Sequence, residues 1–211
     1  SLLQASIAID DDGVLTNIAG NQNTPSSVLY DLIVHYHGSN PTQIWRNIAT
    51  NPSAEEGIHM TLADVDEGDE DGTVRHTLGA RTKYPKVLAR LASMPFASED
   101  GERDSHWSLQ EYIRSAVAKN ENTPPETLDK LGSLSSEEDA NGWIRMAIAR
   151  NLETPYKTLE KLSKLAGDNR PKGKFRVGDS PEKIAAVAEK HMELQRIGAG
   201  TPPSMYPISR W

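Results

Sequence analysis

The apolar residues between positions 113 and 162 form one pattern that occurs twice. Each copy has three apolar residues at i, i+3 and i+4, then an Asn, then two Leu residues. The first copy holds Ile113, Ala116, Val117, Asn120, Leu128 and Leu131, and the second holds Ile144, Ala147, Ile148, Asn151, Leu159 and Leu162. Ile144 follows Ile113 by 31 residues, a period that is typical of stacked helical repeats.

Each copy predicts two short helices. The i, i+3, i+4 spacing places the apolar trio on one face of a helix. We expect this helix to end at Asn120 or Asn151, because Asn tolerates the left-handed conformation that is common at helix C-terminal caps. Thr123-Pro124-Pro125-Glu126 predicts the start of the second helix, with Thr123 as the N-cap, Pro in the first turn and Glu126 completing a capping box.

Three earlier copies are less regular. Their positions are Val14, Asn17, Ile18, Ala19, Asn21, Thr24, Pro25, Leu29 and Leu32 in the first, Ile44, Ile48, Ala49, Asn51, Pro52, Ile58 and Leu62 in the second, and Val74, Arg75, Thr77, Leu78, Arg81, Pro85, Leu88 and Leu91 in the third. Arg81 takes the Asn position of the third copy in this alignment. The interval from there to Asn120 is about eight residues longer than the others, and we assign the excess to an insertion at residues 93–107.

These copies resemble the variant leucine-rich repeat family, whose unit is similar to Val-Arg-x-x-Val-Ala-x-Asn-x-x-Thr-Pro-x-x-x-Leu-x-x-Leu-Ala. The resemblance runs from Val14 to Leu162. It implies an all-α fold, a right-handed α-solenoid of short α- and 3₁₀-helices in parallel layers. The iron–sulfur cluster of the founding member depends on cysteines outside the repeats. This chain has none, so the cluster does not carry over, and we predict no cofactor.

Three regions follow along the chain. Residues 1–165 form the predicted array of about five copies, residues 166–180 a basic linker, and residues 181–211 a C-terminal helix with an extended tail. Ser180-Pro181-Glu182 is a typical helix start. The apolar positions from Ile184 to Leu194 make this helix amphipathic, and we expect it to cap the last layer, as repeat arrays require.

The first residues suggest two alternatives. The stretch from Leu2 to Gly13 resembles the end of a preceding copy, and there is no initiator Met. The chain would then be a piece of a longer protein. The alternative is a natural N-terminal cap.

Composition agrees with an elongated repeat domain. The chain has 211 residues, of which 36% are hydrophobic and 25% charged, and no cysteine. Disulfides, thiolate metal sites and a cysteine nucleophile are thereby excluded. No apolar run approaches the length of a membrane span, and we predict a cytoplasmic protein without a membrane partner.

Acidic residues gather between the copies. Residues 64–72, 99–104 and 137–139 hold 13 of the 30 acidic residues and one basic residue. Because the three segments occupy the same place in the pattern, we expect them to line one edge as solvated loops. A calcium loop at Asp64 is the alternative, although the Gly and Glu positions of an EF-hand do not fit.

An arginine recurs at one position of the copies, as Arg75, Arg114 and Arg145, with Arg46 displaced by one residue. A row of cations could bind phosphates or acidic peptides. The alternative is that each guanidinium bonds to the neighbouring copy. Trp107 and Trp143, like Trp45, stand near the beginning of copies, either as anchors for a partner or as residues that fill gaps between layers.

The sequence favours a non-enzymatic scaffold that binds another protein or a peptide. Arg46, Arg75, Arg114, Arg145, Trp107 and Trp143 are the candidate partner-binding residues. The alternative is a nucleic-acid-binding solenoid, similar to the HEAT-type DNA glycosylases, that uses the arginines and the segment from Lys164 to Arg176. No catalytic or metal-binding motif is apparent.

Overall fold

The protein is all-α in the residues that its computed structural model describes. These are residues 12–35, 41–65, 69, 71–95, 103–135, 138–139, 141–165 and 180–198, with the backbone alone for 103–108. The chain divides into two compact units, Ser1–Asn122 and Thr123–Trp211. The boundary lies in the loop between the two helices of the fourth copy, so each unit contains its own set of packed helices.

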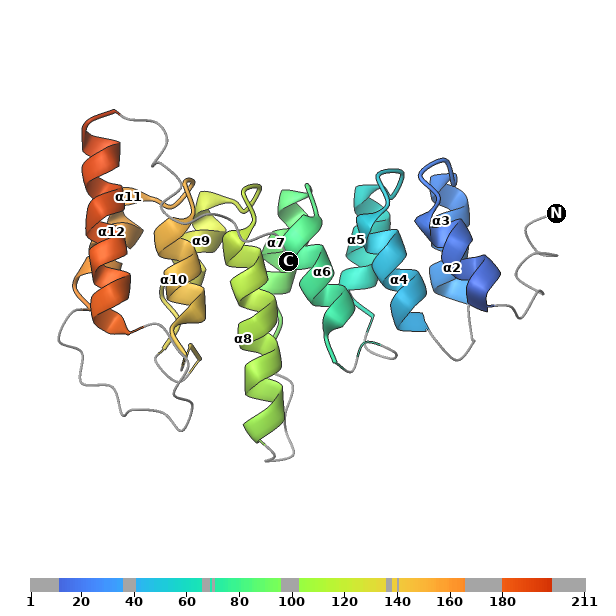
Figure 1. The fold of residues 1–211 in the computed structure, drawn as a ribbon, viewed down its shortest axis with the longest axis horizontal. Coiled ribbons are helices and arrows are strands. Elements are labelled where there is room, and N and C mark those ends of the chain that lie inside the picture. Colours follow the sequence, from blue (N-terminus) through green and yellow to red (C-terminus); the bar gives the residue numbers. More distant parts are fainter. Residues whose placement is uncertain are drawn as a thin grey trace. The chain divides into compact units, whose positions relative to one another are not determined.

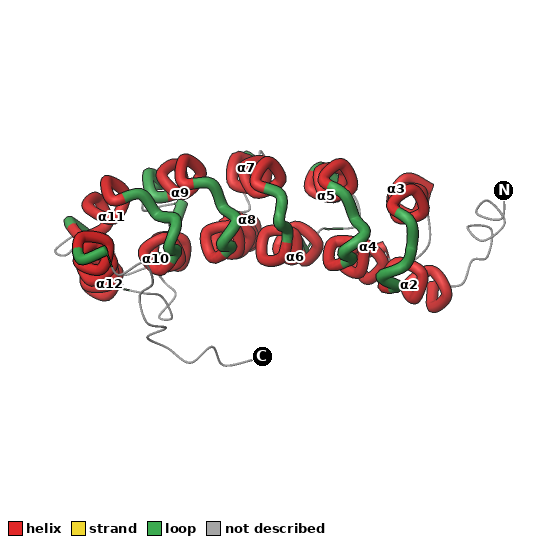
Figure 2. Tube along the Cα trace, turned by 90° about the horizontal axis from the view of Figure 1, so that it is seen from above, coloured by secondary structure: helices red, strands yellow, loops and turns green. Residues whose placement is uncertain are grey.

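The first unit contains two rows of helices. Its helices are α2 (Asp12–Gly20), α3 (Ser26–His35), α4 (Pro41–Thr50), α5 (Glu56–Ala63), α6 (Thr73–Arg81), α7 (Pro85–Ser93) and α8 (Arg103–Lys119). Helices α2, α4, α6 and α8 pack side by side in one row, and α3, α5 and α7 pack in the other (Figures 1 and 2). Each predicted copy thus contributes one helix to each row, up to α8, whose partner helix belongs to the second unit.

The second unit repeats this two-helix pattern on a smaller scale. It holds α9 (Pro125–Leu131), α10 (Trp143–Arg150), α11 (Tyr156–Ser163) and α12 (Pro181–Arg196). Helix α10 packs against α9, α11 and α12. Asp129 on α9 accepts a hydrogen bond from the Thr158 hydroxyl on α11 at 2.7 Å. That bond and the ammonium groups of Lys157 and Lys161 lower the pKa of Asp129 to about 2.

The predicted apolar positions form the cores of both units. Ile113, Ala116, Val117, Leu128, Leu131, Ile144, Ala147, Ile148, Leu159 and Leu162 are each at most 3% exposed. The exceptions are in the first copy, where Val14 is 40% exposed with Leu15 buried in its place, and Ile18 is half-buried. In the described residues, the first and second helices of every copy are α-helices, whereas the resemblance implies 3₁₀-helices as well.

The recurring Asn connects neighbouring copies. The helices end one residue before Asn51, Asn120 and Asn151, as predicted, but Asn151 has φ −76° and an extended conformation. The prediction of a left-handed cap is therefore wrong. Instead, the Asn120 amide is buried and donates to the carbonyl oxygens of Gly79 and Thr82 in the preceding copy, both at 2.9 Å.

The same amide also shapes the loop that follows it. Asn51 Oδ1 accepts from the Ser53 N–H at 2.9 Å, and its Nδ2 donates to the carbonyl oxygens of Ala19 and Asn21. Asn120 and Asn151 accept from the N–H two residues later in the same way. One side chain thus closes its own turn, and Asn51 and Asn120 also satisfy carbonyl groups at the end of the preceding copy.

The recurring Thr does not cap the second helix. Helix α9 has Pro124 at its N-cap position and no capping hydrogen bond from a side chain, so the predicted capping box does not form. Thr24 and Thr154 instead donate to the carbonyl oxygens of Ile18 and Ile148, at 2.6 and 2.7 Å. Each hydroxyl therefore adds a hydrogen bond to a carbonyl at the end of the first helix of its own copy, which also accepts from the N–H of Asn21 or Asn151.

The third copy departs from the predicted register. Helix α6 includes Arg81, and Thr82 follows it with the extended conformation of the Asn position. Thr82 Oγ1 accepts from the Tyr84 N–H two residues later, as the Asn side chains do. Thr82, not Arg81, therefore occupies this position, and the loop to α7 covers only residues 82–84, compared with residues 51–55 in the second copy.

Part of the insertion predicted at residues 93–107 lengthens a helix. Helix α7 ends at Ser93, and α8 begins at Arg103 and is 17 residues long. The first helices of the other copies have 8 to 10 residues.

Helix α12 is the predicted C-terminal helix. Ser180 is its N-cap and accepts a hydrogen bond from the Lys183 N–H at 3.3 Å. The buried residues of α12 include Ile184, Ala188 and His191, and the helix packs against α10 and α11. Residues 1–11, most of the predicted linker and the tail after Gly198 lie outside the described residues. No described helix is long and apolar enough to cross a bilayer.

Candidate functional site

The recurring arginines bond within the protein. In the first unit, Arg75 Nε donates to the Asp69 carboxylate at 2.8 Å, and Arg114 Nη2 donates to the Met94 carbonyl at 2.9 Å. Arg114 is 5% exposed. In the second unit, Arg145 is 6% exposed and bonds to the Leu134 carbonyl and the Asp139 carboxylate. Arg114 and Arg145 therefore present no guanidinium to a partner in this structure.

Arg46 differs from the other arginines. It lies exposed on α4, one residue after the buried Trp45. Trp45 is 6% exposed and fills space in the core, and Trp143 is half-buried at the start of α10. The side chain of Trp107 lies outside the described residues. The candidate residues therefore do not share one surface, and Arg46 is the exposed cation among the four arginines.

A motif that the sequence analysis missed explains two of the arginines. Asp-x-x-Gly-x-x-Arg occurs at Asp69-Gly72-Arg75 and again at Asp139-Gly142-Arg145. Each Asp is almost completely buried and accepts hydrogen bonds from two N–H groups in the first turn of the following helix and from the Arg side chain. Negative charge at this end also complements the helix dipole. The motif could have been found, because it stands at the same position in the third and fifth copies.

The glycine of this motif is required by the backbone. Gly72 has φ +64° and Gly142 has φ +72°, a region that side chains with a Cβ disfavour. A Cβ on Gly72 would also lie 2.2 Å from Leu109 Cδ1. The turn therefore aims the Asp carboxylate back at the helix start only when this residue is Gly.

The acidic segments are thus more than solvated loops. Asp69 and Asp139 are buried structural groups, whereas Asp64 makes an exposed ion pair with Arg90 at 2.7 Å. Residues 66–68 and 70 lie outside the described residues. In the described part of the chain, no cluster of three or more His, Asp or Glu side chains has the geometry of a metal site, so nothing there supports the alternative of a calcium loop.

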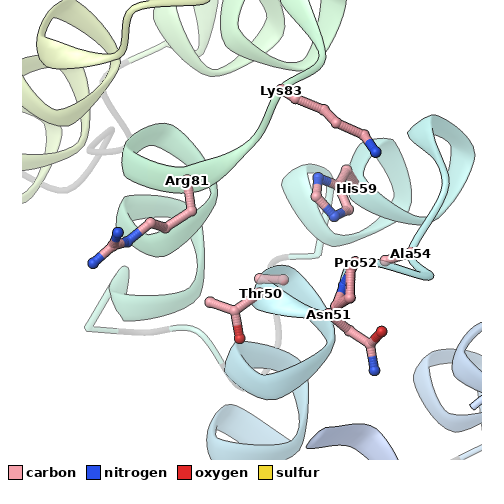
Figure 3. Close-up of a pocket in the computed structure, with 8 residues that line it drawn as sticks. Thr50, Asn51, Pro52, Ala54, His59, Arg81 and Lys83 are labelled. Atoms are coloured by element: carbon pink, nitrogen blue, oxygen red, sulfur yellow. The ribbon is translucent and has the colours of Figure 1, made fainter. Parts of the chain in front are cut away.

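A pocket lies between the second and third copies, where Thr82 replaces Asn. Its volume is about 450 Å³. The lining residues are Ala49, Thr50, Asn51, Pro52, Ala54, His59, Arg81 and Lys83 (Figure 3). We call it the junction pocket. Lys83 extends toward the His59 ring, whereas the Arg81 guanidinium points away from it (Figure 3). Sequence reasoning missed this site, because His59 and Lys83 belong to different copies and to no shared motif.

The His59 imidazole is a buried polar group of the junction pocket. It is 5% exposed, and its Nδ1 lies 2.8 Å from Thr82 Oγ1. Thr82 Oγ1 also accepts from the Tyr84 N–H, and a hydroxyl oxygen has two lone pairs, so the contact fits either tautomer of the ring. Within the described residues Nε2 has no hydrogen-bond partner. The wall of the junction pocket therefore contains a buried, unpaired ring nitrogen, and Lys83 lines the same pocket.

Burial keeps His59 neutral. Desolvation is the main cause and the Lys83 ammonium the second, and together they lower the pKa of His59 from 6.5 to about 4. The ring packs edge-on against Tyr84, with centroids 5.1 Å apart, and the Tyr84 hydroxyl donates to the Ala54 carbonyl at 3.1 Å. His59, Thr82 and Tyr84 together join the third copy to the second.

No acid of the described residues pairs with the positive charge at the junction pocket. Lys83 Nζ lies 5.4 Å from the centroid of the Tyr84 ring, and within the described part of the chain neither Lys83 nor Arg81 makes an ion pair. The lysine is therefore the donor that the pocket presents, since the Thr50 hydroxyl donates within α4 to the Arg46 and Asn47 carbonyls. An ammonium group suits a carboxylate or carbonyl oxygen of a bound segment.

Comparison with protein-family models, curated proteins and solved structures gives no match for this chain. The resemblance to variant leucine-rich repeats therefore stays a prediction that rests on the quoted residues.

Proposed function

We propose that this chain is a non-enzymatic scaffold of the variant leucine-rich repeat type, a right-handed α-solenoid capped by α12, that binds another protein or a peptide. The observation that carries this proposal is the bonding of Asn51 and Asn120 to backbone carbonyls of the preceding copy. A side chain that joins each layer to the last is what a stack of similar units needs, since each unit contacts chiefly its neighbours.

The junction pocket supports a binding role. Stacked helix pairs use the spaces between adjacent units to receive side chains of a partner. This pocket presents the Lys83 ammonium, which makes no ion pair within the described residues. We assign it to an acidic or carbonyl group of the bound segment.

The burial of the recurring arginines weighs against the nucleic-acid alternative. Phosphate binding needs cations that reach solvent, yet Arg114 and Arg145 are buried, and Arg75 is engaged by Asp69. Most of the basic segment from Lys164 to Arg176 lies outside the described residues. DNA binding is therefore an outcome to be tested.

The test uses the full chain as bait. The immobilised protein is incubated with native lysate from its source, and three variants are compared: the wild type, the double variant Arg81→Glu with Lys83→Glu, and the control Lys86→Glu. Lys86 is an exposed lysine of α7 that does not line the junction pocket. We expect a discrete partner that the wild type and the control retain and that the double variant loses.

Two results would contradict the proposal. One is that no protein is retained above the level of an unrelated bait. The other is that the wild type binds a labelled DNA duplex with an affinity that falls steeply with salt, which would favour the nucleic-acid alternative.

A further inference from the structure

A second depression lies between α3 and α5, in the row of second helices. Its volume is about 650 Å³, and its lining residues are Ser26, Ser27, Tyr30, Asp31, Glu55, Gly57, Ile58 and Thr61. We call it the α3/α5 groove. All its residues belong to the first two copies, and the two helices pack directly against each other. The groove is therefore a feature of a single packed pair of copies.

The α3/α5 groove carries negative charge that no described residue compensates. Asp31 is half-buried on α3, and Glu55 is exposed immediately before α5. Within the described residues neither carboxylate makes an ion pair, and no lysine or arginine lines the groove. Tyr30, on α3, is 47% exposed. Two carboxylates beside an open aromatic ring are complementary to a cationic side chain, which pairs with the acids and stacks on the ring.

Gly57 keeps one wall of the groove at the level of the backbone. Gly is unfavourable inside a helix compared with Ala, and packing does not require it here, since a Cβ on Gly57 would meet no atom within 4 Å. Gly57 lies in the first turn of α5, where a helix offers no acceptor for N–H groups. The glycine thus leaves room for a bound backbone and presents an N–H donor to it.

We propose that the α3/α5 groove binds an arginine or lysine side chain of an extended peptide segment, whose backbone carbonyl accepts from the Gly57 N–H. This inference rests on the proposed binding function and names the chemistry of the segment. It differs from the junction pocket, which we assign to an acidic or carbonyl group, so the two sites select different parts of a partner.

The helix dipole does not reverse this preference. The N-terminal end of α5 carries partial positive charge, which disfavours a cation. Glu55 and Glu56 at that same end already supply full negative charges. Asp31 lies on the other helix, in its second turn. The cationic head of a ligand therefore faces carboxylates, and the helix N–H groups face its carbonyl oxygens.

The experiment follows peptide binding by NMR with the full chain. The probes are blocked Gly-Arg-Gly-Arg-Gly, and the same peptide with Gln or Glu in place of Arg. We expect the Arg peptide to shift the Gly57 amide and Tyr30 ring resonances, and the Gln peptide to leave them unchanged. The double variant Asp31→Asn with Glu55→Gln should weaken binding on the order of tenfold at low salt.

Two further variants separate binding from folding. Glu56→Gln removes a neighbouring acid that does not line the groove, and it should bind like the wild type. Gly57→Ala should raise the thermal unfolding midpoint, because Ala favours the helix, and yet weaken binding. A purely structural glycine would not separate these two effects.

The outcomes distinguish this inference from the proposed function. The inference is overturned if the Arg peptide leaves Gly57 and Tyr30 unshifted, or if the Gln peptide binds equally well. If the Glu peptide then shifts His59 and Lys83, the scaffold function stands and the groove assignment alone fails. If no peptide binds and the lysate yields no partner, both fail.

Discussion

Two successive junctions of the first unit are closed by different side chains at the same place in the pattern. Between the first and second copies, the Asn51 amide makes two hydrogen bonds to preceding carbonyls and one within its own turn. Between the second and third copies, Thr82 closes its turn and bonds to His59, and Tyr84 reaches the Ala54 carbonyl. At the first junction the Asn51 amide closes the turn and bonds the preceding copy, and Asn47 and Ser53 add bonds to the Thr16 and Gln22 carbonyls. At the second junction Thr82 closes the turn, and His59 and Tyr84 make the bonds between the copies.

The difference shows what the position requires. A junction needs a group that closes the turn and one that satisfies the carbonyls of the previous copy. Asn has both a donor and an acceptor on one short side chain, whereas Thr is too short to supply the second function. The use of His59 and Tyr84 at the second junction introduces a titratable ring and leaves a pocket. The stability of the second junction should therefore depend on pH, and that of the first should not.

The largest expected effect is at the first junction. Asn51→Ala removes the donor to the Ala19 and Asn21 carbonyls and the acceptor of the Ser53 N–H, and we expect it to lower the free energy of unfolding by about 3 kcal/mol. Urea titration followed by circular dichroism measures the change. Asn21→Ala is the matched control, since Asn21 is exposed and its side chain bonds within its own turn. If both variants lost the same free energy of unfolding, the Asn51 amide would not be what stabilises the first junction.

Acid should weaken the second junction. The lowered pKa of His59 means that the folded state favours the neutral ring. Its stabilisation is complete above the unfolded-state pKa of about 6.5 and is lost as the pH falls toward about 4. Between pH 7 and pH 5 this amounts to about 2 kcal/mol.

The measurement compares urea unfolding at these two pH values. His59→Gln should reduce the pH dependence of stability by most of that amount, because the variant has no ring to protonate. His35→Gln, at an exposed histidine of α3, should keep the dependence of the wild type. A wild-type dependence that His59→Gln leaves intact would show that another group is responsible.

The contrast between the junctions also marks how far the sequence could predict this fold. The helix pairs and their buried rows followed from Ile113, Ala116, Leu128 and their equivalents, because burial of an apolar stripe depends on spacing alone. The recurring Asn located the helix ends correctly. Its actual bonds could not be predicted, because a donor reaching a carbonyl of another copy depends on three-dimensional packing.

The candidate site was harder to predict than the fold. The arginine position was visible in the sequence, but whether Arg114 and Arg145 face solvent or a carbonyl depends on the preceding loops. The Asn position of the third copy was wrongly assigned to Arg81, because alignment by spacing selected that residue. The third copy has a shorter loop, and Thr82 occupies the position. The junction pocket is lined by side chains of two copies, so no local sequence motif predicts it.

A smaller effect is expected from the Thr82 hydroxyl. Thr82→Val keeps the shape of the side chain but leaves His59 Nδ1 and the Tyr84 N–H without their partner, at a cost of about 1 kcal/mol. The variant should also shift the His59 ring resonances in an NMR spectrum. Thr77→Val is the control, since the Thr77 hydroxyl bonds within α6 to the Thr73 carbonyl. If Thr82→Val is as stable as the wild type, the His59 contact does not hold the junction.

The smallest effect is expected at Arg46, and it sharpens the contrast among the arginines. Its side chain is exposed on α4, and an exposed cation contributes little to stability, so Arg46→Gln should change the free energy of unfolding by less than about 0.5 kcal/mol. Arg75→Gln removes a donor from the buried Asp69 carboxylate and should cost clearly more. The two arginines stand one position apart in the pattern. If urea titration gave the same loss of unfolding free energy for both variants, their different surroundings would not affect stability.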